Sequence, residues 1–239
     1  MVEYSFLIPV FNEEGNLMIL HQEIDQVIRQ IGDPCEVIWI DDGSTDNSPV
    51  ILGGLAEKSE NCRIIYFEKN YGQSAALTAG FRSATGNYII TMDSDLQNDP
   101  LDILEMIPFL ADYDMVTGWR KDRADNHWKK FSSRFANQVR NLLSRENIKD
   151  TGCSLKIMKA EYVKKIKMFK GLHRFLPTLM KIEGATVIEI PVHHRKRTKG
   201  KSKYGTWDRA FCGLRDLFAI RWMKDKVISY SIKEVKNGS

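Results

Sequence analysis

The 239-residue chain has no apolar run that approaches the roughly 18 residues of a membrane-spanning helix. Its four cysteines are widely separated and form neither a CxxC pair nor a zinc-binding spacing, so we expect reduced thiols. A predicted strand begins at Tyr4, which leaves no room ahead of it for a signal peptide. With 43% hydrophobic residues, the sequence indicates one large globular domain of a cytoplasmic protein.

Two glycine-rich nucleotide-binding motifs are also missing. No GxGxxG follows the first or second predicted strand, which argues against a dinucleotide-binding site. No glycine-rich loop with a phosphate-binding lysine follows the first strand, which argues against a nucleotidyltransferase. The sequence contains no internal repeat, low-complexity run or linker, so we predict a single domain.

Acidic and basic residues are divided between the two halves of the chain. Residues 1–119 contain 5 Lys and Arg against 20 Asp and Glu, a net charge of −15. Residues 120–239 contain 30 against 11, a net charge of +19. This asymmetry indicates a nucleic acid, an anionic membrane or a phosphorylated substrate as the partner of the second half. An even, solvated basic surface is the plainer alternative.

The first half alternates strand patterns with helical patterns. Each predicted strand is short, apolar and followed by a polar turn, and helical periodicity fills the intervals. This alternation predicts an α/β, Rossmann-like domain with a twisted, mostly parallel sheet and helices on both faces. The predicted strands are Tyr4–Val10, Glu36–Ile40, Arg63–Phe67, Tyr88–Met92 and Asp114–Trp119.

Capping residues and small residues predict how the helices of this half begin and pack. Asn12 is the predicted N-cap of a helix that ends at Gly32. A helix over residues 74–83 has one side of small residues, including Ala76 and Gly80, which permits close packing on the sheet. Pro100 is predicted to begin another covering helix, with an apolar face of Leu101, Leu104, Ile107 and Leu110.

The second half contains two basic segments with aromatic residues at helical spacing, residues 122–149 and 207–226. The first either packs on the sheet as an ordinary helix or lies on an anionic bilayer with its lysines extended to water. The last is too polar and too short to span a bilayer, and it suits a position on the bilayer surface. Between them, the sequence predicts a turn entering a strand over Asp150–Met158 and a further strand over Ala185–Val192. The apolar positions of the last segment are Trp207, Phe211, Leu214, Phe218 and Trp222.

Two carboxylates one residue apart, Asp93 and Asp95, follow the strand Tyr88–Met92, and Gln97 comes one alternation later. Groups at the carboxyl end of a parallel strand face the crevice where α/β proteins bind ligands. Three oxygen donors at this spacing suit Mg²⁺ or Mn²⁺, and such a cation can neutralise a departing nucleoside diphosphate. For this motif alone, a solvated acidic loop that caps the next helix is the plainer alternative. Asp42, after the second strand, can accept hydrogen bonds from a base or a ribose.

The strand Ala185–Val192 leads into residues 193–205, where lysines and arginines are interspersed with glycines. We expect this segment to recognise phosphate. A nuclear-localisation or nucleic-acid patch is the generic alternative. Base-stacking aromatics are not interleaved with the charges, so we expect no nucleic-acid partner.

Six short motifs occur in order along the chain: Ile8–Glu14, Asp41–Asp46, Asn70–Gly72, Asp93–Gln97, Asp150–Cys153 and Gly200–Tyr204. Together they resemble the motifs of family 2 glycosyltransferases with the GT-A fold. Within that family the sequence is most similar to the dolichol- and polyprenyl-phosphate sugar transferases, such as the dolichol-phosphate mannosyltransferases. The resemblance covers residues 4–205.

The resemblance implies an inverting, metal-dependent transfer of a sugar from a UDP- or GDP-linked donor to a polyprenyl or dolichyl phosphate at the cytosolic face of a membrane. It implies Mg²⁺ or Mn²⁺ as the cofactor, held by Asp93, Asp95 and Gln97. Where the family often has tyrosine, Phe11 keeps the stacking surface and lacks the hydroxyl. The implied nucleotide-sugar contacts are Pro9, Phe11, Glu13, Asp42, Asp93, Ser94 and Asp95.

For the chemical step, the resemblance implies catalytic roles for Asp95, Arg120, Lys130 and Arg134. The implied contacts of the acceptor phosphate are Arg197, Lys199, Ser202 and Lys203. A phosphate monoester already carries about −1.5 to −2 charges at neutral pH, so it needs no strong general base. Catalysis then consists of positioning and charge stabilisation.

We therefore predict a GT-A domain over residues 1–205, with a nucleotide-sugar half (1–119) and an acceptor half (120–205), followed by an amphipathic membrane-associating segment (206–239). Several relatives continue into transmembrane helices where this sequence stops, so we expect peripheral attachment to an anionic membrane surface. A membrane protein or a second copy of the chain is a further expected partner. Two alternatives stay open: a family 2 transferase with a glycan or other soluble acceptor, and a catalytically silent nucleotide-sugar-binding subunit.

Overall fold

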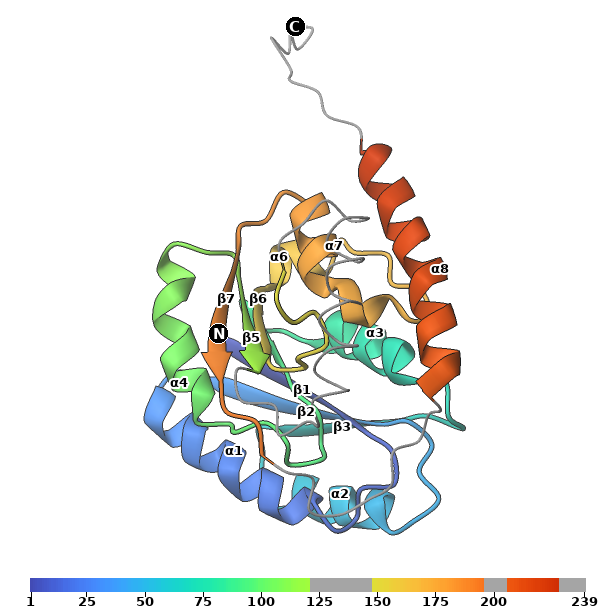
Figure 1. Ribbon diagram of the computed structural model, residues 1–239. Helices are drawn as coiled ribbons and strands as arrows, with labels where there is room; N and C mark the ends of the chain where they lie inside the picture. The colour runs from blue at the N-terminus through green and yellow to red at the C-terminus, as the bar shows by residue number, and fades with distance from the viewer. Residues whose placement is uncertain (121–147, 196–205, 228–239) are drawn as a thin grey trace, which may run out of the picture.

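A seven-stranded sheet lies between two layers of helices (Figure 1). The computed structural model describes residues 1–120, 148–195 and 206–227, without the side chains of 206–214. The α/β class and mostly parallel sheet predicted from the sequence are confirmed. The strands are β1 (Tyr4–Val10), β2 (Cys35–Asp41), β3 (Cys62–Tyr66), β4 (Tyr88–Thr91), β5 (Met115–Arg120), β6 (Lys156–Lys159) and β7 (Val187–Val192).

The strand order is β3-β2-β1-β4-β6-β5-β7, and only β6 runs antiparallel to its neighbours. The carboxyl ends of β1 to β4 therefore share one edge of the sheet. Because β6 is antiparallel, its first residue, Lys156, pairs with the last residue of β4, Thr91, at that same edge. The chain order reverses at β1, which lies between β2 and β4, and such a switch point opens a ligand-binding crevice.

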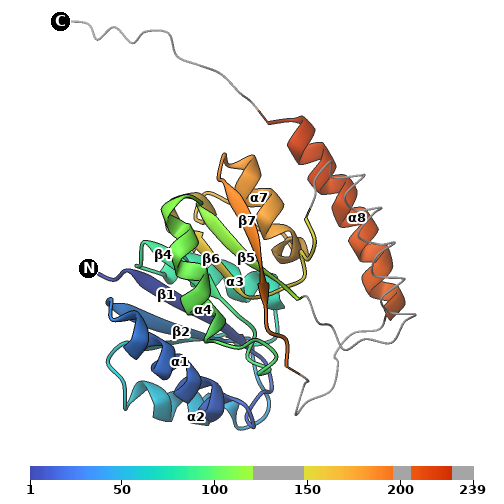
Figure 2. The ribbon, with the colours of Figure 1, turned by 60° about the vertical axis from the view of Figure 1, so that its left-hand side comes forward.

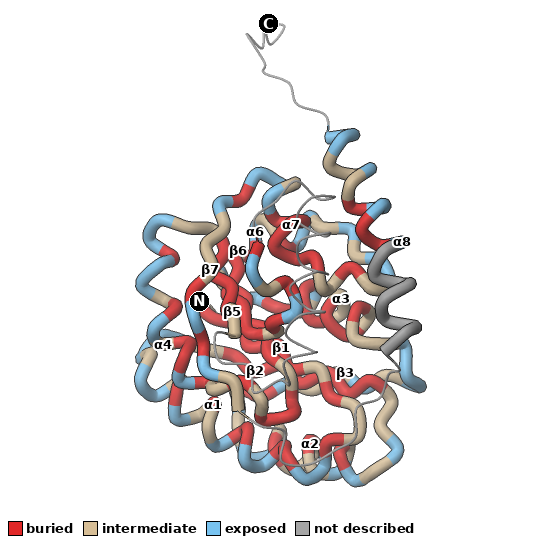
Figure 3. Tube along the Cα trace, viewed as in Figure 1, coloured by how far each residue is buried: buried red, intermediate tan, exposed pale blue. Residues whose placement is uncertain are grey.

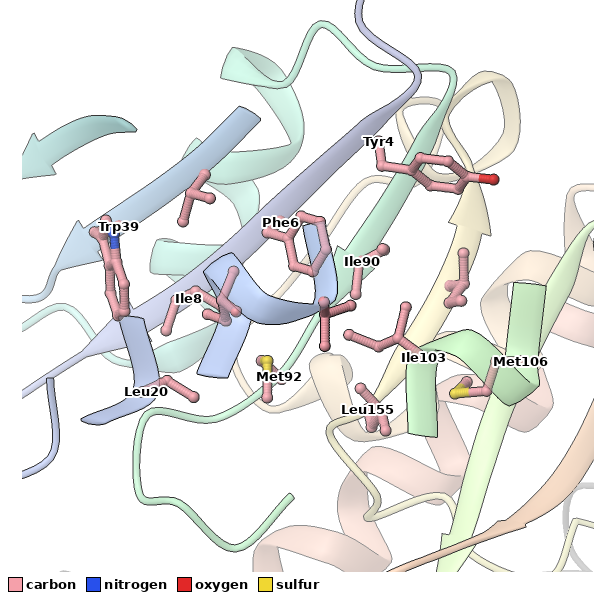
Figure 4. Packing of buried hydrophobic residues seen from close by; sticks show 14 of the residues in the cluster. Tyr4, Phe6, Ile8, Leu20, Trp39, Ile90, Met92, Ile103, Met106 and Leu155 are labelled. Atoms are coloured by element: carbon pink, nitrogen blue, oxygen red, sulfur yellow. The ribbon is translucent and has the colours of Figure 1, made fainter. Parts of the chain in front are cut away.

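One face of the sheet is covered by α1 (Leu17–Ile31), α2 (Ser48–Ala56) and α4 (Asp102–Met106). Figure 4 shows the packing at this face, where Phe6 and Ile8 of β1 lie among side chains from β2, β4, α1 and α4. Alternate residues of a strand point to opposite faces, so Leu7 belongs to the other core cluster. Burying each such side chain contributes about 1.5–3 kcal/mol.

The opposite face is covered by α3 (Gln73–Ser83), α6 (Ala160–Val163) and α7 (Leu176–Ile182). The small side of α3 packs as predicted. A Cβ atom added at Gly80 would lie 2.9 Å from Cδ1 of Leu7 and 3.3 Å from Cδ1 of Ile40. A larger residue at this position would force the Leu7 side chain to shift, so glycine favours the close packing of α3 on the sheet.

Two predicted helix boundaries are wrong. The first helix begins at Leu17, flanked by Asn16, and Asn12 lies in the loop before it with a left-handed backbone (φ 55°). The helix expected after Pro100 is an α-helix only over α4, and a 3₁₀ turn, η1 (Ile107–Ala111), follows because Pro108 cannot continue the helical hydrogen bonds. The predicted apolar face is confirmed in part: Leu110 is buried, and Leu104 and Ile107 pack partly buried against the core. Leu101 is exposed instead, and Ile103 and Met106 are buried in addition.

The last described helix, α8 (Thr206–Asp225), packs on α7 and on the 3₁₀ turn η2 (Leu172–Phe175) (Figure 2). Leu217 and Ile220 are buried there. Phe218 and Trp222 are turned outward, 63% and 65% exposed, and Figure 3 shows the alternation of buried and exposed positions along the helix. Among the described residues, no helix is long and apolar enough to cross a membrane.

The cysteines are consistent with the predicted reduced state where they are described. Cys35, Cys62 and Cys153 carry free thiols. The side chain of Cys212 and the predicted helix over residues 122–149, apart from its last two residues, lie outside the described part of the chain.

Candidate active site at the carboxyl edge of the sheet

The loops that follow β1 and β2 hold each other through side chain to backbone hydrogen bonds. The N–H of Thr45 donates to Oδ1 of Asn12 at 2.7 Å, and the N–H of Glu13 donates to Oγ of Ser48 at 3.0 Å. The N–H of Glu14 donates to Oδ2 of Asp46 at 3.1 Å. Asn12 therefore fastens two loops together at the crevice, which explains its left-handed backbone better than the predicted capping role.

Asp42 binds backbone groups that lead into α3. Its carboxylate accepts hydrogen bonds from the N–H groups of Tyr71 at 2.7 Å and Gly72 at 2.9 Å. The neighbouring Gly43 has φ 69°, and an added Cβ would collide with the backbone of Lys69. Asp42, expected to meet a base or ribose, thus shapes the loop that precedes α3.

An open pocket of about 530 Å³ lies at the ends of β1, β2 and β3. Of the predicted nucleotide contacts, Phe11 lines it, together with Asp41, Tyr66, Lys69 and further residues of the same loops. The sequence argument missed Asp41, Tyr66 and Lys69, although each lies where a predicted strand ends.

Three other predicted contacts have protein partners. Glu13 is buried and accepts a hydrogen bond from Nδ2 of Asn16 at 2.6 Å. The hydroxyl of Ser94 donates to the carbonyl of Pro9 at 2.9 Å, which ties the loop after β4 to the end of β1. Their predicted contacts with a nucleotide sugar stay predictions.

Asp93 and Asp95 lie together at the end of β4. Nε2 of Gln73 donates to Oδ1 of Asp93 at 2.7 Å, and the N–H of Gln97 donates to Oδ1 of Asp95 at 3.1 Å. Burial raises the pKa of Asp93, and the nearby charge of Asp95 raises it further. A divalent cation would relieve this repulsion, so the two carboxylates fit such an ion.

The rest of the donor set for a cation is sparse. Among the described residues, no group of three or more His, Cys, Asp and Glu side chains converges on one point. Nε2 of Gln97 lies 3.5 Å from Nε2 of His194, so the side-chain amide of Gln97 contacts a histidine ring. A cation bound to Asp93 and Asp95 would therefore take further ligands from a diphosphate or from water.

Arg120, a predicted catalytic residue, forms a two-pronged ion pair with Asp150. Nε and Nη2 of Arg120 donate to the two carboxylate oxygens at 2.7 and 2.9 Å, and both side chains are largely buried. The N–H of Gly152 also donates to Asp150, at 3.1 Å. The pair fixes the turn that enters β6 beside the end of β5.

A second, narrow pocket lies next to Asp93 on the side of the sheet that α3 and α7 cover. Gln73, Asp93, Ser154, Lys156 and His173 contribute its polar wall. The sequence argument missed Lys156 and His173. Lys156 is the one charged residue after Asp150 in the stretch Asp150–Met158, predicted as a turn entering a strand, and this is a usable signal. Nothing in the pattern around His173 indicates the pocket.

The basic segment after β7 begins beside the carboxylate pair. The N–H of Arg195 donates to the carbonyl of Gln97 at 2.8 Å. Its guanidinium pairs with Glu23 at 2.7 Å and with Asp99 at 2.8 Å. Six residues for which the resemblance implies catalysis or contact with the acceptor phosphate lie outside the described residues: Lys130, Arg134, Arg197, Lys199, Ser202 and Lys203.

A mostly parallel sheet with a switch point, and an acidic pair in the crevice it opens, define a ligand-binding α/β protein. The model of the family described as "Glycosyl transferase family 2" matches residues 5–167. The chain belongs to this family.

Two curated relatives are each 36% identical to the chain. A dodecaprenyl-phosphate galacturonate synthase from Rhizobium johnstonii aligns over 230 residues, 92% of this chain and 66% of the relative. An undecaprenyl-phosphate 4-deoxy-4-formamido-L-arabinose transferase from Pectobacterium carotovorum aligns over 202 residues, which are 84% of this chain and 62% of that relative. The chain thus spans slightly less than two thirds of the length of these relatives.

The fold is also shared with solved structures of low sequence identity. Glucosyl-3-phosphoglycerate synthase from Mycobacterium tuberculosis, in complex with Mn²⁺, UDP and phosphoglyceric acid, superimposes with a TM-score of 0.66 at 15% identity. The match covers 95% of this chain and 80% of that structure. At this identity the likeness concerns the fold alone.

Proposed function

We propose that this chain transfers a sugar from a UDP- or GDP-linked donor to a polyprenyl phosphate, at the cytosolic face of a membrane. The observation that carries the proposal is the backbone hydrogen bond from Arg195 to Gln97. It places Arg195, the last described residue before the basic segment continues, beside the loop that carries the carboxylate pair, which supports an anionic acceptor next to a metal-bound diphosphate. The names of both curated relatives, which specify a sugar and a polyprenyl phosphate, support the same reaction.

On the donor side, Phe11 offers a ring in the open pocket for a base. Asp93 and Asp95 follow β4, the strand that pairs with β1 on the side away from β2. A Mg²⁺ or Mn²⁺ ion held by these two carboxylates would neutralise charge that develops on the departing nucleoside diphosphate. The hydrogen bond from Gln73 orients Asp93, and the bond between Ser94 and Pro9 keeps the loop on β1. The protein thus positions the donor before the reaction begins.

On the acceptor side, the phosphate of the lipid is its own nucleophile and needs only orientation and charge compensation. The net charge of +19 in residues 120–239 supports the approach of this second polyanion to the first. Arg120 is held by Asp150, so we assign the pair to positioning the turn that enters β6.

A radiolabel transfer assay tests the proposal. The protein and a short polyprenyl phosphate are offered UDP-glucose, UDP-galacturonic acid, UDP-N-acetylglucosamine and GDP-mannose separately, with Mg²⁺ or Mn²⁺ and again with EDTA. A butanol-extractable product that forms from one donor and disappears with EDTA is the expected result. Metal-dependent hydrolysis of a donor without any lipid product would overturn the lipid acceptor and favour a soluble one.

We also propose that α8 lies against the membrane. Phe218 and Trp222 are exposed one helical turn apart, with Arg221 and Lys224 on the same helix, a combination that suits an anionic bilayer surface. Replacing Phe218 and Trp222 together with serine should weaken co-sedimentation with phosphatidylglycerol vesicles at least about tenfold. Serine at the exposed Phe109, on η1, is the matched control, and equal binding by both variants would overturn this role of α8.

A further inference from the structure

The narrow pocket beside Asp93 is separate from the open pocket at the ends of β1 to β3. It lies between α3, η2, the end of β4 and the start of β6, and it has room for about one water molecule. Its polar wall comes from Gln73, Asp93, Ser154, Lys156 and His173, and apolar side chains of α3 and α7 close the rest. A pocket of this size can receive a single small substituent of a larger ligand.

Lys156 supplies a positive charge to this pocket. It is 3% exposed, and its ammonium makes no hydrogen bond or ion pair with any of the described residues. Thr91 of β4 and Thr117 of β5 flank it in the sheet, and burial lowers the pKa of Lys156. A buried ammonium group without a bonded partner is costly. A ligand oxygen that accepts from Lys156 would offset that cost.

His173 supplies a neutral hydrogen-bond donor. Oγ of Ser74 lies 2.7 Å from Nδ1 of His173 and accepts the N–H of Gly171 at 3.0 Å. The Ser74 hydroxyl still has a proton to donate to Nδ1, and we assign the ring proton to Nε2 on that basis. Burial, with the charges of Arg174 and Lys156, lowers the pKa of His173 to about 4, so the ring stays neutral at physiological pH.

Asp93 supplies the acceptor. Its Oδ1 takes a hydrogen bond from Gln73, and a carboxylate has further lone pairs for a second donor. The pocket therefore joins donors on Lys156 and His173 to an acceptor on Asp93. A hydroxyl group satisfies both sides because it accepts and donates, whereas a methyl group satisfies neither.

We propose that this pocket is a recognition subsite for one hydroxyl group of the sugar carried by the donor, with Lys156 and His173 as specificity-determining residues. The inference rests on the proposed use of a nucleotide sugar and not on the identity of the acceptor. The open pocket at the ends of β1 to β3, proposed for the base, shares no lining residue with the narrow pocket. The subsite should therefore contribute to affinity for the sugar and not for the nucleoside diphosphate.

Calorimetric titration in Mn²⁺ without any acceptor tests the subsite. UDP-glucose, UDP-galactose, UDP-N-acetylglucosamine and GDP-mannose are compared with UDP and GDP. We expect the wild type to prefer one nucleotide sugar over the others and over its free diphosphate. Lys156→Met should reduce that preference at least about tenfold, while affinity for UDP or GDP stays within about twofold.

Lys159→Met is the matched control, because Lys159 lies on the same strand and its ammonium pairs with Asp114 at 2.8 Å. It should keep the wild-type preference. His173→Phe, which keeps a ring but removes the hydrogen-bond donor, is the second test variant if Lys156→Met does not fold, as judged by thermal unfolding. Retention of the preference in every folded test variant, or an equal loss of affinity for nucleotide sugar and free diphosphate, would overturn the subsite.

The titration and the transfer assay together distinguish failure of the subsite from failure of the proposed reaction. If no lipid product forms in the transfer assay but sugar preference depends on Lys156, the subsite stands and the lipid acceptor fails. If product forms but the preference is independent of Lys156 and His173, the reaction stands and the subsite fails. If the wild type binds no nucleotide sugar, both fail.

Discussion

Closely spaced acids lie at the end of β2 and just after the end of β4, yet the two acidic loops differ in what their carboxylates bind. After β2, Asp41 accepts the N–H of Ser44 at 3.2 Å, and Asp42 accepts those of Tyr71 and Gly72. After β4, Asp93 accepts a side-chain amide, and burial together with the charge of Asp95 raises its pKa. The first loop uses its charge to build backbone structure, and the second keeps charge available to a ligand.

Asp95→Asn, in the loop after β4, should have the largest effect of the series, and this effect should be on activity. One carboxylate of the cation site is lost, so we expect sugar transfer to fall about 10²–10³-fold. The fold should persist, because an amide oxygen can still accept the N–H of Gln97. Transfer rate and circular dichroism are the measurements, with the exposed Asp112→Asn as control. Wild-type rates in Asp95→Asn would remove Asp95 from the metal site.

Asp42→Asn, in the loop after β2, should lower the stability of the protein. Asparagine replaces only one of the two carboxylate oxygens, so the 2.9 Å bond from Gly72 to Oδ2 is lost and the 3.2 Å bond to Oδ1 is left, now to an uncharged group. We expect the free energy of unfolding to fall by about 2 kcal/mol, measured by urea denaturation. Asp33→Asn, at an exposed turn, is the control and should change it little. Unchanged stability in Asp42→Asn would mean that the carboxylate does not hold the loop.

Asp93→Asn, in the loop after β4, should raise stability, which is the opposite of the effect expected for Asp42→Asn in the loop after β2. The folded protein raises the pKa of Asp93, so the ionised carboxylate destabilises the wild type above that pKa. With EDTA present at neutral pH, the variant should therefore unfold at a higher urea concentration. The difference should shrink as the pH falls through the folded-state pKa and vanish near the ordinary value of 3.8. A variant less stable than the wild type at pH 7 would contradict this account.

Asp225→Asn gives the lower limit of the series. Asp225 pairs with Arg221 at 2.8 Å one turn away on α8, and its side chain is half exposed. Solvent screens such a pair, so we expect a change in unfolding free energy within about 0.5 kcal/mol. A loss as large as that of Asp42→Asn would show that α8 depends on this pair.

The strands were predictable because each is an apolar run between turn residues. β1 has the predicted bounds, and β2 to β5 differ from the predicted bounds by one residue at one or both ends. The position of Asp93 and Asp95 at a carboxyl edge followed from the same reasoning. Helix starts failed at Asn12, whose side chain binds a loop 33 residues away in sequence.

The partners of site residues were not predictable, because they depend on strand order. No local pattern indicates that β6 enters between β4 and β5, which brings Lys156 next to Thr91 and Thr117. Likewise, the pattern around Asp42 suits a ligand contact as well as it suits the backbone of Tyr71. η2 and α7, which carry His173 and the closing wall of the narrow pocket, lie in a stretch where no element was predicted.

The position of β6 also constrains the order in which the chain can fold. β5 pairs with β6 and β7 but has no ladder with β4, so residues 1–120 alone leave β5 without a strand to pair with. Four parallel strands, β3-β2-β1-β4, can assemble early during synthesis, while β5 must wait for residues 156–192. The acid-rich half is therefore not an independent folding unit, and β5 is an exposed edge until the basic half has emerged.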